Sequence, residues 1–392
     1  MPWKQRKALD EKKYFIEEWK RKEMSLAELC RRYEISRQTG YKWLERYEQE
    51  GEAGLEEHRR APLHHPQAMS TEVRDAVVNM RSQHPNWGPR KLRACLQRDT
   101  PRMVCPAASS IGDLLRREGL AHPRRKRKRT PPYTEPLKHA HAPNQVWCAD
   151  FKGWFLTKDG VRCDPLTITD AYSRYLLRCC VVKKTDGEHV WAVFEAAFRE
   201  FGLPEAIRTD NGSPFASRAP AGLSQLSMLW MTLGIRHERI EPGKPQQNGR
   251  HERMHQTLKQ ETASPPERNL RRQQQAFLRF QKEYNHVRPH EALKYRTPAS
   301  QYVGSERRYP AKLPELEYPE GAKLRRVSHH GDVKLDGEQM FVSALLAWEV
   351  VGLLEIQQDP HWLEVYYGPL LIGWMDLRRS KLLPIGTGRR RR

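Results

Sequence analysis

The sequence predicts a multidomain protein with all-α helix-turn-helix units at the N-terminus, an α/β core in the middle and a small β-barrel at the C-terminus. Its 392 residues are too many for one ordinary domain. Apolar residues recur at helical spacing over residues 12–50 and 71–119, and strand-like runs alternate with helices from Gln145 onward. We expect domains at residues 1–60, 70–122, 144–303 and 316–380, with a basic linker at 123–143 and a basic tail at 381–392.

The charge balance of the chain points to a polyanionic partner. Lysine and arginine number 69 against 48 acidic residues, which gives a net charge of +21. Such a surface attracts nucleic acid, because neutralising phosphates releases counterions. A basic protein that binds no nucleic acid is the alternative on charge alone. No apolar run of membrane-spanning length and no apolar export segment is visible, so we expect a cytoplasmic, nucleoid-associated bacterial protein without membrane contact.

The cysteines argue against a disulfide framework and against a zinc cluster. Seven cysteines are present, which is an odd number, and no two of them are separated by only two residues. We expect most of them to be buried thiols in a reducing compartment.

Residues 12–50 read as three short helices that form a helix-turn-helix. Phe15, Ile16 and Trp19 give the first helix an apolar stripe, Ser25 begins a capping box with Glu28, and Ser36 caps the last helix. The outer face of that last helix carries side chains that can reach phosphates and base edges. These candidate DNA contacts are Arg37, Gln38, Thr39, Tyr41 and Lys42. Many helical hairpins share the pattern, so it does not establish DNA binding by itself.

Residues 51–69 read as a linker, and a second helical unit follows. Thr71 is expected to cap its first helix, Pro89 to begin its second, and Gly119 to end its third. This unit is either a second helix-turn-helix or a helical spacer.

A strongly basic segment separates the second helical unit from the core. Six adjacent positive charges repel one another and do not fold alone. Either they contact DNA phosphates along the linker, or they are simply solvated. The six residues are Arg124, Arg125, Lys126, Arg127, Lys128 and Arg129.

The core reads as a mixed sheet covered by helices. Strands are expected at Val146–Phe151, Leu166–Thr169, Tyr175–Val182, Ala206–Thr209 and Ile235–Ile240. Helices are expected around Val190–Phe198, around Leu223–Leu233 and from near Gln247. Further on, glycines split short β-like runs over residues 316–378, which suggests a small barrel.

Three acidic residues stand out by their context. Asp150 lies in the apolar strand VWCADF, Asp210 ends the strand in IRTDNG, and Glu252 begins a helix in QNGRHERMH. Converging carboxylates are hard oxygen ligands that suit Mg²⁺, with Mn²⁺ as a possible substitute. Two such ions can clamp the attacking and the leaving oxygen of a phosphoryl transfer. Taken singly, each acid is more often a helix cap or a salt-bridge partner.

These motifs resemble the retroviral-integrase-like core of DDE transposases from bacterial insertion sequences. The resemblance is carried by QVWCADF, ITDAYSRY, RTDNGSPF, KPQQNGRHERMHQTLKQE and YNHVRPHEAL…TPASQY. The helical units and the C-terminal strands fit as well, and the chain looks most similar to the insertion-sequence family numbered four-eight-one. The resemblance implies a ribonuclease-H-like fold, dependence on Mg²⁺ and recognition of terminal inverted repeats. Asp170 also matches, as a turn residue to which we assign no metal.

The third acidic position departs from the resembled pattern. The spacing between Asp210 and Glu252 is longer than is typical of the family, and Glu241 and Glu261 are rivals for the role. The surrounding motif favours Glu252.

Several neighbours of Glu252 are candidates for gripping the DNA backbone. His255 and Lys259 follow Glu252 by three and seven residues and are expected on the same helix face. Lys244 and Asn248 precede the helix and extend this set. The plainer interpretation is an amphipathic helix with a polar side.

The leading hypothesis is a recombinase that acts on double-stranded DNA. Water attacks a phosphodiester at the element end and frees a 3′-OH, which then attacks target DNA by transesterification. No GxxxxGK[ST] loop for ATP is present, as expected for bond-for-bond exchange. Two ends must be held together, so we expect at least a homodimer. The alternatives are a catalytically retired DNA-binding regulator and a ribonuclease of the same fold.

Overall fold

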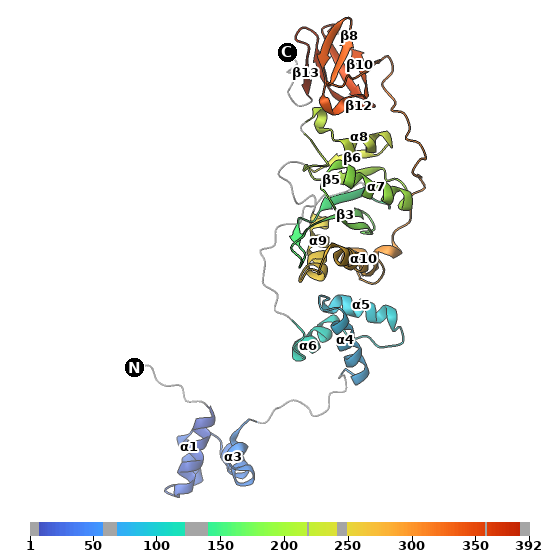
Figure 1. The fold of residues 1–392 in the computed structure, drawn as a ribbon. Helices are drawn as coiled ribbons and strands as arrows, with labels where there is room; N and C mark the ends of the chain where they lie inside the picture. Colours follow the sequence, from blue (N-terminus) through green and yellow to red (C-terminus); the bar gives the residue numbers. More distant parts are fainter. Residues whose placement is uncertain are drawn as a thin grey trace. The chain divides into compact units, whose positions relative to one another are not determined.

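The computed structural model describes residues 8–57, 69–121, 140–217, 219–240, 249–356 and 359–384 (Figure 1). The chain divides into two compact units, Met1–Met69 and Ser70–Arg392. Within the described ranges, no helix combines the length and the apolar character that crossing a bilayer requires.

The first unit is a three-helix bundle, as the apolar spacing predicts. It comprises α1 (Ala8–Arg21), α2 (Leu26–Arg32) and α3 (Arg37–Glu50). The predicted capping box is present: the Ser25 side chain accepts the backbone N–H of Glu28, and the Glu28 carboxylate accepts the Ser25 N–H at 3.0 Å. Ser36 caps α3 through the N–H of Thr39.

The helical unit extends further along the chain than the sequence suggested. A 3-10 turn, η1 (Gly51–Leu55), follows α3, and its Leu55 is fully buried in the same core as Phe15 and Leu29. The prediction that a linker begins at residue 51 is therefore wrong. One leucine among glycine, alanine and glutamate gives no periodicity, so the local pattern could not show it.

The second unit begins with three more helices, α4 (Thr71–Gln83), α5 (Pro89–Asp99) and α6 (Ala108–Arg117). Pro89 is the first residue of α5, as predicted, but Ser70 rather than Thr71 caps α4 through the N–H of Val73. The turn before α5 buries Trp87 almost completely, with its ring stacked on His84 at 3.7 Å between centroids.

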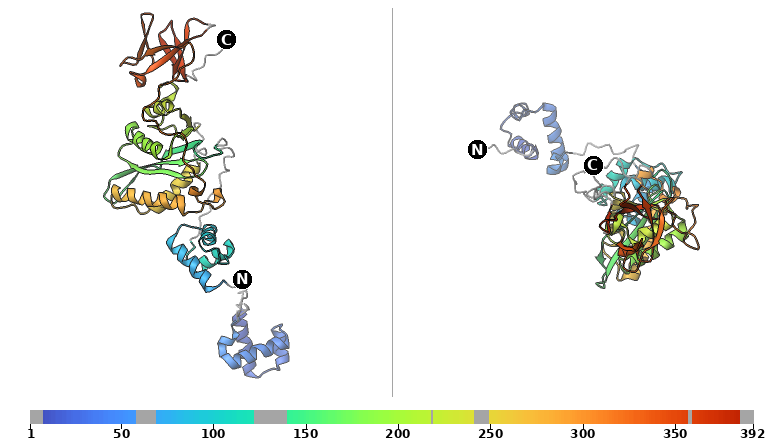
Figure 2. Two further views of the ribbon diagram at one scale, coloured as in Figure 1. Left: turned by 90° about the vertical axis from the view of Figure 1, so that its right-hand side faces the viewer. Right: turned by 90° about the horizontal axis from the view of Figure 1, so that it is seen from above.

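The core is a mixed sheet with helices on both faces (Figure 2). Its strands are β1 (Val146–Phe151), β2 (Phe155–Leu156), β3 (Arg162–Asp170), β4 (Leu176–Val182), β5 (Ala206–Thr209) and β6 (Arg236–Arg239). Its helices are α7 (Gly187–Phe201), α8 (Gln225–Thr232), α9 (Gly249–Thr262) and α10 (Leu270–His286). Short 3-10 turns are η2 (Pro220–Gly222), η4 (Glu291–Leu293) and η5 (Pro298–Ser300). The predicted α/β core is confirmed, with β3 longer than expected.

Strand β1 lies between an antiparallel and a parallel neighbour. It pairs antiparallel with β3 and parallel with β5, which in turn pairs parallel with β6. Alternate β1 residues face opposite sides of the sheet. Trp147 and Ala149 pack in the core beneath α7 and α8, whereas Val146 and Cys148 lie on the face that α9 and α10 cover.

Helix α10 was not predicted, and it covers the edge strand β4 with amide side chains. The Asn285 carbonyl oxygen accepts the Leu176 N–H at 2.8 Å, and Gln274 accepts the Val181 N–H at 2.8 Å. Gln281 donates to the carbonyls of the same strand. These side chains occupy backbone groups that another strand would otherwise pair with.

The C-terminal segment forms a nearly closed sheet. In the described residues the strand order is β7-β10-β11-β12-β13-β9-β8, and the two end strands contact each other. The elements are β7 (Lys323–Arg326), β8 (Asp332–Leu335), β9 (Glu338–Phe341), η6 (Ala344–Leu346), β10 (Val350–Glu355), β11 (Trp362–Tyr367), β12 (Leu370–Asp376) and β13 (Lys381–Pro384). Because β13 pairs with β12, residues 381–384 belong to this sheet, and the predicted tail boundary at residue 381 is wrong.

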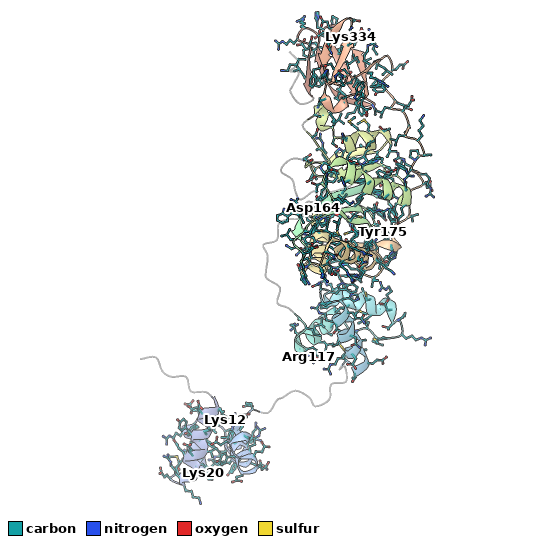
Figure 3. The ribbon with its side chains drawn as sticks, in the orientation of Figure 1. Lys12, Lys20, Arg117, Asp164, Tyr175 and Lys334 are labelled. Carbon is teal, nitrogen blue, oxygen red and sulfur yellow. The ribbon has the colours of Figure 1, made fainter. Side chains whose placement is uncertain are left out.

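All seven cysteines lie in the described ranges and carry free thiols. Five of them are buried and two are partly buried, which confirms the prediction of mostly buried thiols. Figure 3 shows the side chains on these elements.

The substitution Gly40→Ala is expected to destabilise the first unit, against the usual helix preference. Alanine normally stabilises a helix interior by about 1 kcal/mol relative to glycine. A Cβ at residue 40 would lie 2.5 Å from the Cys30 sulfur and 3.3 Å from Phe15. We expect a net loss of about 1–3 kcal/mol from overpacking, measured by hydrogen exchange of the α1–α3 amides in the full chain.

Cys30→Ala is the matched second change for this experiment. It removes the clashing sulfur, so Gly40→Ala should cost less in its presence than in its absence. Stronger protection of these amides in Gly40→Ala alone would contradict the packing argument.

Candidate active site

Asp150 and Asp210 lie at the carboxyl ends of two neighbouring parallel strands. In the β1–β5 ladder, Cys148 pairs with Arg208, and each aspartate comes two residues later in its chain. A step of two residues keeps a side chain on the same face, so continuation of this register sets the two carboxylates side by side. Both side chains are partly buried. The register thus places two of the three predicted acids at the same end of neighbouring strands.

A glycine leaves room beside the second carboxylate. The backbone N–H of Gly212 donates to Asp210 Oδ1 at 3.2 Å. A Cβ on residue 212 would lie 3.0 Å from Asp210 Oδ2, inside ordinary contact distance. Any larger residue would therefore press on the carboxylate oxygens.

Glu252 lies in the first turn of α9 with its side chain exposed. The helix is fastened to the sheet at Thr167, the residue opposite Asp150 in the β1–β3 ladder. The Thr167 hydroxyl lies 2.6 Å from Nε2 of His251 and 2.7 Å from Nε2 of His255. The same hydroxyl donates to the backbone carbonyl of Asp150 at 3.1 Å. One side chain thus joins the helix of Glu252 to the strand of Asp150.

The number of hydrogen bonds that the Thr167 hydroxyl can donate limits where the two imidazoles carry their hydrogens. A threonine hydroxyl has one hydrogen to donate and two lone pairs. One hydrogen cannot serve the Asp150 carbonyl and two imidazoles at once, so at least one of the two Nε2 atoms carries a hydrogen and donates it to the hydroxyl. Burial lowers the pKa of His251 to about 3 and the pKa of His255 to about 2, so both rings are neutral. The sequence predicted no role for Thr167 or His251. The four-residue spacing of His251 and His255 could have indicated that both rings share one face of the helix.

The structure does not assemble all three acids into one metal-binding cluster. Across the parts of the chain that the structure describes, no three His, Cys, Asp or Glu side chains are placed to hold a metal ion. Residues 241–248, which precede α9, lie outside these ranges, and the rival Glu241 is among them. The position of Glu252 relative to the aspartates is therefore a prediction.

The second rival, Glu261, is engaged elsewhere. Its carboxylate pairs with Arg288 at 2.5 Å, and both side chains are largely buried. Burial raises the pKa of Glu261, and the Arg288 guanidinium opposes that shift. An acid committed to a buried arginine is a poor choice for a metal ligand, which favours Glu252.

The expected set of DNA contacts around Glu252 needs one correction. His255 does not share the exposed face of Glu252 and Lys259, because its ring is buried against Thr167. Lys259 is exposed as predicted. The other predicted contacts lie outside the described residues: Lys244, Asn248, Arg124, Arg125, Lys126, Arg127, Lys128 and Arg129.

The outer face of α3 presents most of the predicted recognition residues to solvent. The exposed side chains are Arg37, Gln38, Tyr41 and Lys42. Thr39 is only partly exposed, and its hydroxyl lies 2.8 Å from the hydroxyl of the capping residue Ser36.

Asp170 is the last residue of β3 rather than a turn residue, and it is fully buried. Its carboxylate accepts the N–H of Asn144 at 2.8 Å and both the N–H and the hydroxyl of Ser173. Burial raises the pKa of Asp170 although these donors oppose the shift. The carboxylate thus closes the turn between β3 and β4.

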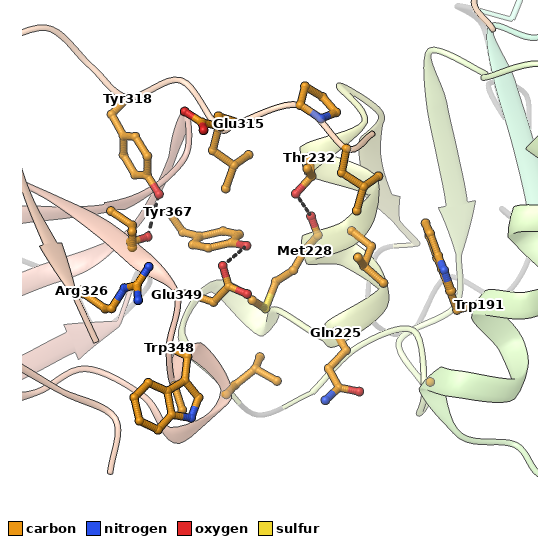
Figure 4. Close-up of a pocket in the computed structure, with 18 of the residues that line it drawn as sticks. Trp191, Gln225, Met228, Thr232, Glu315, Tyr318, Arg326, Trp348, Glu349 and Tyr367 are labelled. Atoms are coloured by element: carbon orange, nitrogen blue, oxygen red, sulfur yellow. Dashed lines mark hydrogen bonds between the residues drawn. The ribbon is translucent and has the colours of Figure 1, made fainter. Parts of the chain in front are cut away.

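A large cleft elsewhere in the second unit is separate from the acidic residues. It has a volume of about 820 Å³ and lies among α7, α8 and the C-terminal sheet (Figure 4). Trp191, Met228, Arg326 and Trp348 are among its lining residues, and Tyr367 donates to Glu349 at 3.2 Å within it. None of Asp150, Asp210 and Glu252 lines it, so we do not place the chemistry there.

The substitution Thr167→Val is expected to destabilise the core by at least about 2 kcal/mol, because it removes the hydroxyl that hydrogen-bonds two buried imidazole nitrogens. Valine keeps the shape, so the loss would report the hydrogen bonds. Denaturant unfolding measures it. Thr257→Val on the same helix is the control, since that hydroxyl only bonds the Arg253 carbonyl, and a change within about 0.5 kcal/mol is expected. Equal effects of the two variants would refute the role of Thr167.

The stability of the core is expected to fall as pH falls from 6.5 to 5. Burial lowers the pKa of His290 to about 3, so the unfolded chain takes up a proton in this range that the folded chain does not. One such histidine contributes a slope of up to about 1.4 kcal/mol per pH unit. His290→Gln should reduce the slope in pH-dependent unfolding, whereas the exposed His286→Gln should leave it unchanged. An unaltered slope in His290→Gln would contradict the assignment.

Family comparisons match helix-turn-helix-type domains over the N-terminal helices and integrase core domains over the α/β core. Residues 140–245 and 233–298 each match an integrase core domain. Residues 11–62 match a helix-turn-helix domain, and residues 39–115 match a homeodomain-like domain.

Two relatives are proteins of bacterial insertion elements. The IS407 uncharacterized 31.7 kDa protein of Burkholderia multivorans is 30% identical over 225 residues, which cover 57% of this chain and 78% of the relative. The IS476 uncharacterized 39.2 kDa protein of Xanthomonas euvesicatoria is 28% identical over 250 residues, which cover 64% of this chain and 69% of the relative.

Similar solved structures include the HTLV-2 integrase catalytic core domain in complex with magnesium, in its trimeric form. It has a TM-score of 0.34 and 18% identity over 42% of this chain and 99% of that chain. A simian T-cell lymphotropic virus intasome in complex with the PP2A regulatory subunit B56 gamma has a TM-score of 0.36 and 17% identity over 75% of this chain and 97% of that chain. Similarity at this level carries no argument about function. The domain matches and the insertion-element relatives show the family. The chain belongs to the bacterial insertion-element transposases that carry an integrase core and helix-turn-helix domains.

Proposed function

We propose that this protein is an active DNA transposase whose acidic residues are Asp150, Asp210 and Glu252. The observation that carries the proposal is the placement of Asp150 and Asp210 at the ends of adjacent parallel strands. The helix of Glu252 is fastened to the same place through Thr167.

The donor set suits Mg²⁺, with Mn²⁺ as a substitute. Carboxylate oxygens are the hard ligands that these ions prefer, and Gly212 keeps space beside Asp210. Asp150, Asp210 and Glu252 would hold two ions, which when bound would lower the pKa of the attacking water and stabilise the leaving oxygen. The three side chains would thus fix where the reaction occurs on the DNA backbone.

The reaction consists of two exchanges at phosphorus. Water attacks the phosphodiester at the element end, and the P–O bond to the 3′ oxygen breaks to leave a 3′-OH. That hydroxyl then attacks a phosphodiester of target DNA, forming one P–O bond as another breaks. Each step replaces one phosphate ester bond or hydrolyses it, so no nucleotide cofactor is needed.

The helical units would supply recognition of the element ends. The exposed face of α3 would contact the terminal inverted repeats, and the net charge of +21 would hold the DNA backbone. Because two ends must be joined in one event, we expect at least a dimer on DNA.

The substitution Asp150→Asn should abolish nicking without abolishing DNA binding. The full chain is incubated with a labelled duplex that carries the element's own inverted repeat and Mg²⁺. We expect Asp150→Asn and Glu252→Gln each to reduce nicking at least about 100-fold, because an amide replaces a charged metal ligand. Glu338→Gln, at an exposed acid on β9, is the matched control and should nick normally.

Two outcomes would overturn this proposal. Sequence-specific binding by the natural chain without any nicking would identify a DNA-binding regulator. Preferential cleavage of an RNA–DNA hybrid would identify a ribonuclease.

A further inference from the structure

Two arginines meet at one backbone carbonyl on the sheet face that carries the aspartates. Arg174, in the turn after β3, donates to the Ala171 carbonyl through Nη1 at 2.6 Å. Arg250, at the start of α9, reaches the same oxygen through Nη1 at 3.4 Å. Figure 3 labels Tyr175, the residue after Arg174. Two like charges therefore share a single neutral acceptor.

Neither guanidinium has a carboxylate partner in the part of the chain that the structure describes. The nearby Asp170 carboxylate is occupied by hydrogen bonds from Asn144 and Ser173. Arg208 provides the contrast, because it pairs with Glu238 at 2.9 Å with both side chains largely buried. An unneutralised pair of arginines is costly unless an anion joins it.

The backbone at Arg174 adds an independent observation. Its φ is +66°, in the left-handed region where glycine is the least strained residue. A side chain that persists at a strained position suggests a function for that side chain. The arginine is thus kept at a backbone cost that glycine would avoid.

The position of the pair relates it to the candidate active site. Burial raises the pKa of the Cys148 thiol, and the charges of Arg208, Arg174 and Arg250 oppose that shift, so all three guanidiniums lie in the neighbourhood of this thiol. Cys148 precedes Asp150 by two residues and faces the same side of β1. Arg250 is exposed, so solvent reaches the pair.

We propose that Arg174 and Arg250 together bind one phosphate group of the DNA backbone on the sheet face that carries Asp150. Guanidinium groups form paired, charge-assisted hydrogen bonds with phosphate oxygens. The site reads no sequence, because it contacts only the backbone. The identity of the ligand as DNA rests on the proposed function; the phosphate chemistry of the site does not.

The first test uses inorganic phosphate and the full chain. Thermal unfolding is followed as phosphate replaces chloride at constant ionic strength, without DNA or divalent metal. We expect a saturable rise in Tm that is lost in Arg174→Gly and in Arg250→Gln. Arg271→Gln, at an exposed arginine of α10 in the same core, is the control and should keep the rise.

The choice of Arg174→Gly separates binding from folding. Glycine relieves the positive φ, so this variant should unfold in chloride no earlier than the natural chain. Arg250→Gln changes an exposed side chain at a helix start and provides a second variant that does not depend on the turn. Retention of the full phosphate-dependent rise by both variants would overturn the proposal.

The second test uses duplex DNA in EDTA, where no nicking occurs. Each phosphate contact contributes about 0.9 to the slope of log K against log salt concentration. Each single variant should lower the slope by about that amount, and the double variant by no more, because both arginines hold one phosphate. A double variant with twice the loss would show two separate contacts and refute the shared site.

These tests are independent of catalysis. If the natural chain binds phosphate as described but never nicks DNA, the proposed function fails and the phosphate site stands. If nicking depends on Asp150 but both arginine variants behave like Arg271→Gln, the phosphate site fails alone.

Discussion

The pairing of β1 with β3 on one side and β5 on the other is the constraint on which the core depends. This pairing buries Trp147 completely, and truncating such a side chain to alanine typically costs about 3–5 kcal/mol. Alternation along β1 then leaves Asp150 on the opposite face, at the point where the strand leaves the core. The same ladder sets Asp210 beside it. One strand register thus fixes both the packing of Trp147 and the positions of the two candidate aspartates.

The register of β1 with β3 also places Thr167 opposite Asp150, where its hydroxyl hydrogen-bonds to helix α9. A helix that packs only through apolar side chains can slide or rotate by small amounts, whereas hydrogen bonds have direction. His251 and His255 hold α9 at one rotation about its axis, and the intervening Glu252 is exposed. Their neutral form is part of this arrangement, since a protonated ring so deeply buried would be costly.

Much of the core could be predicted from sequence because its inner strands are unbroken apolar runs. Residues 146–151 and 206–209 are of this kind, and strands buried on both faces read in this way. Helix α10 was missed although the sequence carries its signal, because Ala276, Phe277, Phe280 and Tyr284 recur at helical spacing on its buried side.

The strand-end positions of the two aspartates could be predicted from the sequence, but the placement of α9 could not. The two aspartates follow from strand ends, a local signal. The rotation of α9 does not: three residues along a helix turn the side chain by about 300°, and only tertiary packing decides that His255 lies inside while Glu252 lies outside. Likewise, a single leucine could not show that η1 belongs to the first unit.

The amide side chains of α10 have a consequence for how copies of this core can associate. They occupy the outer edge of β4, so a second copy cannot extend the sheet there without first displacing Asn285, Gln274 and Gln281. Each of those hydrogen bonds contributes about 1 kcal/mol. Their loss would leave the amide side chains of α10 without their partners on β4. Self-association by strand addition is therefore disfavoured at this edge, and the chain can be concentrated on DNA without polymerising through β4.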